Sequence, residues 1–120
     1  MREPYREELS QLRETLEEMK DLLKRIQKED RPYFYRFLDR MKNNIEIGLC
    51  LDVDHQIKLD EILLRDWIAA NDAYTGIPDY YSSALNLKRN QAAREEFARL
   101  AVAIEEYFKQ HGGGSICRRF

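Results

Sequence analysis

The side chains best suited to chemistry are two histidines and the carboxylates beside one of them. Asp52 and Asp54 precede His55, and the second histidine is His111. Together they could offer three or four ligands to a divalent metal. The spacing supplies one Asp-x-x-His pair, whereas a di-iron helical site needs two Glu-x-x-His pairs and two further glutamates. We therefore predict no metal and no other cofactor, and we interpret these residues as solvated surface groups.

Candidates for nucleophilic catalysis are few. Cys50 lies in an apolar run, which predicts a buried and unreactive thiol. Ser82 and Ser83 are residue types that commonly begin a helix. The sequence contains neither a glycine-rich phosphate loop nor a Gly-x-Ser-x-Gly motif. We predict that the protein is not an enzyme.

Aromatic residues concentrate in three stretches, at residues 33–37, 67–74 and 80–81. An up-down helical bundle would bring these stretches to one end of the molecule, and there we predict an aromatic cluster that includes Tyr33, Tyr35, Trp67, Tyr80 and Tyr81. Two roles remain open for it. The rings either close the end of the core or dock a protein partner, because Tyr and Trp are enriched at binding hot spots. Adjacent rings such as Tyr80 and Tyr81 cannot both point inward from one helix, so some should be exposed.

Basic side chains give the last expected helix a local positive bias. They are Lys88, Arg89, Arg94 and Arg99. Side chains of this kind contact phosphate groups in nucleic-acid complexes. Acidic residues at positions 95 and 96 and a net charge of -2 for the whole chain favour an ordinary solvated face. A nucleic-acid-associated subunit is therefore our alternative hypothesis.

A heptad pattern near the start of the chain is the strongest structural signal. Large apolar residues recur at alternating spacings of four and three, at Tyr5, Leu9, Leu12, Leu16, Met19, Leu23 and Ile26. This spacing places them on one narrow stripe of a helix, which we call the seam. The seam requires a helical partner, either in this chain or in another molecule.

The same reasoning extends to the rest of the chain. We expect helices over about 4–28, from about 31 onward, around 62–74, and from 79–83 to 111. Pro78 after Gly76 marks a stop between the last two. The predicted fold class is mainly α: an antiparallel bundle of about four helices with a coiled-coil-like first helix.

One segment carries a competing signal. From Ile45 to Val53 apolar and other residues alternate with a period of two, which is typical of a strand. The alternative is an α+β fold with a β-hairpin at about 44–59. We favour the helix, because an isolated two-stranded hairpin is only marginally stable and both flanks are strongly helical.

The length of 120 residues suits one domain with one core. We predict a single helical domain over 1–111 and a flexible tail over 112–120, whose consecutive glycines extend a helix poorly. The apolar runs are shorter than the ~20 residues that a membrane span needs. The start of the sequence has no apolar stretch like that of a signal peptide. The expected location is cytoplasmic, without a membrane partner.

These features predict a non-enzymatic helical module for protein–protein interaction, such as an adaptor, a regulator or a small subunit of an assembly. Docking would use any uncovered part of the seam together with exposed tyrosines. Self-association is the simplest form, because a two-fold mate can cover a seam that the chain itself leaves open.

Overall fold

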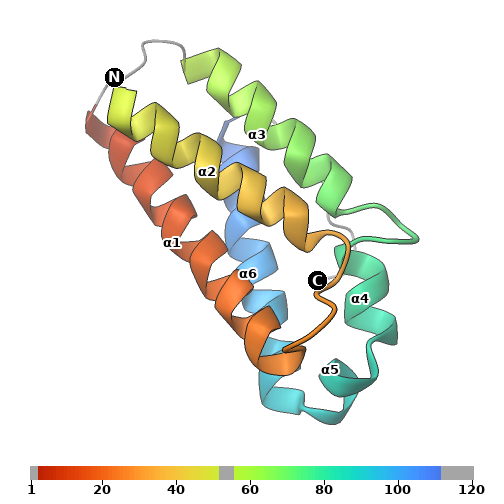
Figure 1. Ribbon diagram of the computed structural model, residues 1–120. Coiled ribbons are helices and arrows are strands. Elements are labelled where there is room, and N and C mark those ends of the chain that lie inside the picture. Colours follow the sequence, from red (N-terminus) through yellow and green to blue (C-terminus); the bar gives the residue numbers. More distant parts are fainter. Residues whose placement is uncertain (1–2, 52–55, 112–120) are drawn as a thin grey trace.

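The computed structural model describes residues 3–51 and 56–111, which form helices and contain no strand (Figure 1). The predicted mainly helical fold is therefore confirmed for this part of the chain. The helices are α1 (Glu3–Ile26), α2 (Tyr35–Leu51), α3 (Gln56–Ala70), α4 (Ile77–Ser83), α5 (Leu85–Arg89) and α6 (Gln91–Gln110). The expected tail at 112–120 lies outside the described residues.

Helix α1 packs between α2 and α6, and α3 packs beside α2 (Figure 1). Contacts between side chains of different helices show how these helices run relative to one another. On α1, Arg6 donates to the Leu49 carbonyl near the end of α2, and Lys20 contacts Asp39 near its start, so α1 and α2 are antiparallel. At the other flank, Arg25 near the end of α1 contacts Glu96 near the start of α6. Helix α6 is therefore also antiparallel to α1.

The seam of α1 is buried inside this one chain. Tyr5, Leu9, Leu12, Leu16, Met19 and Leu23 are each at most 4% exposed, and Ile26 is partly buried against the same core. Because α1 packs against α2 and α6, the helical partner that the seam requires is supplied in cis. A surface for another molecule must lie elsewhere.

The predicted β-hairpin alternative at about 44–59 is wrong for the described part of that segment, because residues 44–51 belong to α2 and 56–59 to α3. The spacing of the buried residues explains why this segment is a helix and not a hairpin. Leu38, Met41, Ile45 and Gly48 repeat at spacings of three and four and are all buried, whereas Ile47 is 55% exposed. Residues 52–55, where the hairpin turn would fall, are outside the described residues.

Gly48 permits the close approach of α3 to α2. A Cβ atom at this position would lie 2.9 Å from a terminal methyl carbon of Leu59 on α3. Further along the same pair, Arg40 Nη1 on α2 lies 3.3 Å from Asp66 Oδ1 on α3. The small residue and the ion pair together fix these two helices side by side.

The second half of the chain is divided more finely than the sequence suggests. Helix α3 ends at Ala70, and the side chain of Asp72 then accepts hydrogen bonds from the backbone N–H groups of Tyr74 and Thr75. The segment expected as one helix up to residue 111 is three helices, because the backbone is extended at Ala84 and Asn90. Asn90 caps α6 by accepting from the N–H of Ala93 at 3.0 Å.

None of the helices in the described ranges is both long and apolar enough to cross a membrane.

Leu16 tests the burial of the seam. Leu16→Ala should lower the free energy of unfolding by about 2–5 kcal/mol, because it removes a fully buried side chain and leaves a cavity. Glu14→Ala, an exposed position on the same helix, is the matched control and should change little. Urea unfolding at equilibrium measures both. Equal effects of the two substitutions would contradict the observed packing of α1.

Candidate functional site

Part of the predicted aromatic cluster forms a core layer at one end of the molecule. Phe34 is fully buried, and its ring lies 5.4 Å from that of Tyr80 and 6.2 Å from that of Phe97. Tyr81 stacks on the other side of this layer, 6.4 Å from Phe97. Burial raises the pKa of Tyr80 above its usual range. These rings close the end of the core.

Other aromatic rings at this end face the solvent. Tyr33 is 52% exposed, and the guanidinium of Arg36 lies 4.0 Å from its ring centre. Tyr74, in the connection between α3 and α4, is 87% exposed. Tyr35 is half-buried, with Arg31 over its ring at 5.3 Å. Tyrosine and arginine are both residue types that are enriched at protein–protein interfaces.

Trp67 does not join this aromatic layer. Its side chain is fully buried and stacks on Phe108 of α6, with ring centres 6.1 Å apart. Its indole N–H donates to Oε2 of buried Glu105 at 2.8 Å. Trp67 therefore serves the contact between α3 and α6 and is not available for docking.

A groove of about 590 Å³ lies at this end of the molecule, and Tyr80 of the aromatic layer is part of its lining. It lies between the α1–α2 connection and the short helices α4 and α5, and its lining is Gln27, Pro32, Asp79, Tyr80, Ser83, Ala84 and Asn86. Hydrogen bonds hold the two sides together. The hydroxyl of Tyr80 donates to Gln27 Oε1 at 3.4 Å, and Asn86 Nδ2 donates to the carbonyl of Ile26 at 3.3 Å. We call this groove together with Tyr33 and Tyr74 the aromatic end.

The four predicted phosphate contacts are spread over two helices. Lys88 and Arg89 are exposed in the last turn of α5. On α6, Arg94 lies over the ring of Tyr81 at 4.5 Å, and Arg99 Nη2 is 3.6 Å from Glu18 Oε2 on α1. Two of the four cations thus have neighbours within the chain, and the continuous basic helix that we expected is interrupted at residue 90.

His111 lies in a polar cluster at the opposite end of the molecule. Its Nε2 atom is 2.6 Å from Glu8 Oε2, and its Nδ1 atom is 3.4 Å from Asp60 Oδ2. The hydroxyls of Tyr5 and Tyr107 both donate to Asp60 Oδ1, at 2.8 and 2.6 Å. We call these residues the histidine cluster. It joins α1, α3 and α6.

Of the metal ligands considered from the sequence, the structure describes His111 alone. Asp52, Asp54 and His55 lie outside the described residues, and no group of His, Cys, Asp and Glu in the remainder is arranged to hold a metal ion. Cys50, expected to be buried, is exposed. Cys50 lies off the face of α2 that carries the buried residues Met41, Ile45 and Gly48, so its place in an apolar run predicted the wrong environment.

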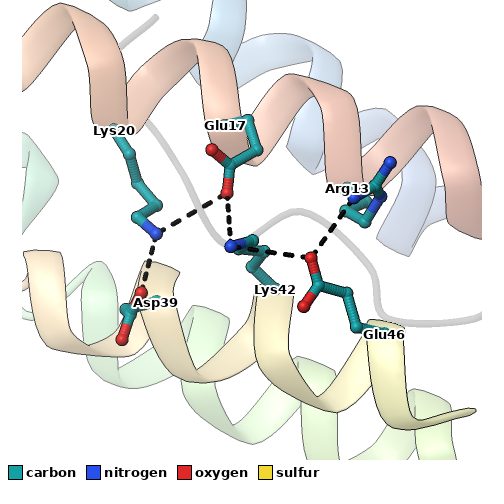
Figure 2. Close-up of polar contacts among 6 residues, drawn as sticks. All are labelled: Arg13, Glu17, Lys20, Asp39, Lys42 and Glu46. Carbon is teal, nitrogen blue, oxygen red and sulfur yellow. Dashed lines mark hydrogen bonds and ion pairs between the residues drawn. The ribbon is translucent and has the colours of Figure 1, made fainter.

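Charged side chains also form a continuous network between α1 and α2 (Figure 2). Lys20, although 4% exposed, places Nζ 2.6 Å from Asp39 Oδ1. Lys42 Nζ lies 3.0 Å from Glu17 Oε1 and 3.5 Å from Glu46 Oε1. The hydrogen bond from Lys42 lowers the pKa of Glu17. A buried lysine requires such partners, so the network fixes how α2 lies on α1.

Several of these residues are not evident in the sequence. Lys20 follows a seam position and reads as an ordinary solvated lysine. Asp60 has no motif around it, and its position between two tyrosines depends on the approach of α3 to α1 and α6. Only the heptad phase of Tyr5 and the repeat of Tyr107 with Ile104 indicate that these rings face inward.

Comparison with known proteins adds no relative, since no protein-family model, curated protein or solved structure matches the chain.

The histidine cluster predicts a steep alkaline loss of stability. Burial, followed by the hydrogen bond to Asp60, raises the pKa of Tyr107 far above its usual range. Above pH ~10 the unfolded chain loses this proton while the folded chain keeps it, so folding is disfavoured as pH rises. At pH 11 the share of the loss that comes from Tyr107 should reach about 1 kcal/mol, so Tyr107→Phe should lose less stability than the parent. A smaller loss should remain in this variant, because burial also raises the pKa values of Tyr5 and Tyr80. Urea unfolding from pH 8 to 11 measures it.

The control for that experiment is Tyr74→Phe, since Tyr74 is 87% exposed. It should follow the pH dependence of the parent protein. A Tyr107→Phe variant with the same alkaline slope as the parent would contradict the burial of this hydroxyl.

Asp39 tests the charge network. The hydrogen bond from Lys20 lowers the pKa of Asp39. The ionised carboxylate therefore stabilises the fold at neutral pH, and this stabilisation is lost as the carboxylate is protonated in acid. Because Asp39 is half-exposed, Asp39→Asn should cost only about 1 kcal/mol at pH 7, and less below pH ~4. Thermal unfolding of this variant, with exposed Asp21→Asn as control, measures the effect. An equal cost at pH 7 and pH 3 would contradict it.

Proposed function

We propose that this chain is a non-enzymatic helical module for protein–protein interaction and that it docks through the aromatic end. Its role would be that of an adaptor, a regulator or a small subunit, acting as a cytoplasmic protein. We interpret the architecture as an antiparallel bundle with a coiled-coil-like first helix. A second copy of the chain is the simplest partner.

The observation that carries this proposal is the exposure of two tyrosines, at the end of the molecule that also carries a groove. Tyr74 is 87% exposed and Tyr33 is 52% exposed, while the seam is buried. Tyrosine offers a large contact area with a polar tip at low conformational cost, which suits a docking surface. The groove of about 590 Å³ provides a concave element, and its lining includes Pro32, which precedes Tyr33 in the sequence. Self-association would therefore use the aromatic end and not the seam.

The alternative is a nucleic-acid-associated subunit. It is supported by the exposure of Lys88 and Arg89 in the last turn of α5. Ionic strength separates the two proposals, because phosphate contacts weaken steeply with salt whereas aromatic docking persists. A duplex that bound the parent protein only at low salt, and not Lys88→Glu/Arg89→Glu, would favour the alternative.

The aromatic end is tested by the double variant Tyr33→Ser/Tyr74→Ser. The parent should show a molar mass that rises with concentration and resists high salt, and the double variant should show a lower mass at equal concentration. Light scattering across a concentration series measures both. Ile47→Ser on α2 is the control, since it removes a side chain of similar exposure (55%) near the other end.

Two results would contradict self-association through the aromatic end. One is a parent protein that stays monomeric throughout the series. The other is a double variant whose molar mass rises with concentration as that of the parent does, whatever the result for Ile47→Ser.

A further inference from the structure

Both ring nitrogens of His111 face carboxylates from other helices. Nε2 lies 2.6 Å from Glu8 Oε2 on α1, and Nδ1 lies 3.4 Å from Asp60 Oδ2 on α3. A neutral imidazole carries one N–H group and can donate to only one of these oxygens. The imidazolium form carries a positive charge that attracts both carboxylates, and its Nε2–H donates to Glu8 while Nδ1 forms an ion pair with Asp60.

The other groups around the ring also favour a cationic imidazole. Tyr107 stacks on the imidazole with ring centres 4.3 Å apart, and Tyr5 meets it edge-on at 5.8 Å. Their hydroxyls both donate to Asp60 Oδ1, so Asp60 is held by donors on this side while Oδ2 faces His111. The described charged groups in contact with the ring are thus Glu8 and Asp60, both negative when ionised.

We infer that His111 is a pH-sensitive clasp, in which protonation of the imidazole fastens the end of α6 to α1 and α3 and deprotonation loosens it. Imidazoles as a class change charge between about pH 5 and 8, a range in which carboxylates stay ionised. Below this range the carboxylates themselves gain protons. The inference is independent of the aromatic end, which lies at the other end of the molecule.

A histidine that acts as a clasp and one that only packs differ in how their contribution to the free energy of unfolding depends on pH. If His111 only fills space, its replacement costs the same at every pH. If it bridges two carboxylates as a cation, the protein is stabilised by His111 at the acidic side and loses this advantage as pH rises. The difference in stability between parent and variant, measured at two pH values, therefore separates the effect of the charge on His111 from the effect of packing.

The experiment compares the parent with His111→Gln, a polar residue that cannot be protonated, by urea unfolding at pH 5.5 and 8.0. The parent's advantage in urea midpoint should be larger at pH 5.5 by about 0.5 M. Glu8→Gln should reduce this pH dependence. His55→Gln removes the other histidine and should leave it unchanged. An equal advantage at both pH values would overturn the proposal.

Amide hydrogen exchange of the parent alone provides a second reading that needs no variant. After correction for the intrinsic effect of pH, the amides of residues 104–110 should exchange faster at pH 8.0 than at pH 5.5, because the end of α6 opens more often. Equal corrected rates would also overturn the proposal, whatever the stability of the variants.

Discussion

Helix α1 holds the central place in this molecule, and its apolar stripe must be covered on two flanks at once. Leu9, Leu16, Met19 and Leu23 are inaccessible to solvent between α2 and α6. Burial of each such side chain contributes about 1.5–3 kcal/mol, whereas an exposed ion pair contributes at most about 1 kcal/mol. The seam therefore supplies the stability. The ionic network of Figure 2 adds less energy and instead selects the position of α2 along α1.

The two ends of the molecule differ in the kinds of side chain that they carry. One end combines a buried aromatic layer with exposed rings and a groove, and this is the surface that we propose for docking. The other end is closed by hydrogen bonds and ion pairs around Asp60 and His111. A docking surface at one end and a charge-dependent closure at the other can coexist, since the same packed α1 separates them.

The sequence allowed prediction of what depends on helical periodicity. The heptad spacing identified most of the buried face of α1 but not Lys20 and Leu22, which are also buried. The spacing of Leu38, Met41 and Ile45 argued for a helix against the competing alternation. Features that depend on contacts between distant segments were not predictable. Trp67 was assigned to the aromatic cluster, but it packs on Phe108, because α3 meets α6 further from that end than an idealised bundle suggests. Likewise, breaks at Ala84 and Asn90 divide a segment whose apolar spacing continues across them.

The central claim is that one chain covers its own seam. Amide hydrogen exchange along α1 at widely different protein concentrations tests it most directly, since exchange reports whether these backbone groups are protected in each molecule. We predict that the amides of residues 9–23 keep the same protection when the protein is diluted a hundredfold. Loss of protection on dilution would show that the seam is closed between chains, and it would contradict the arrangement of α1 between α2 and α6 of the same molecule.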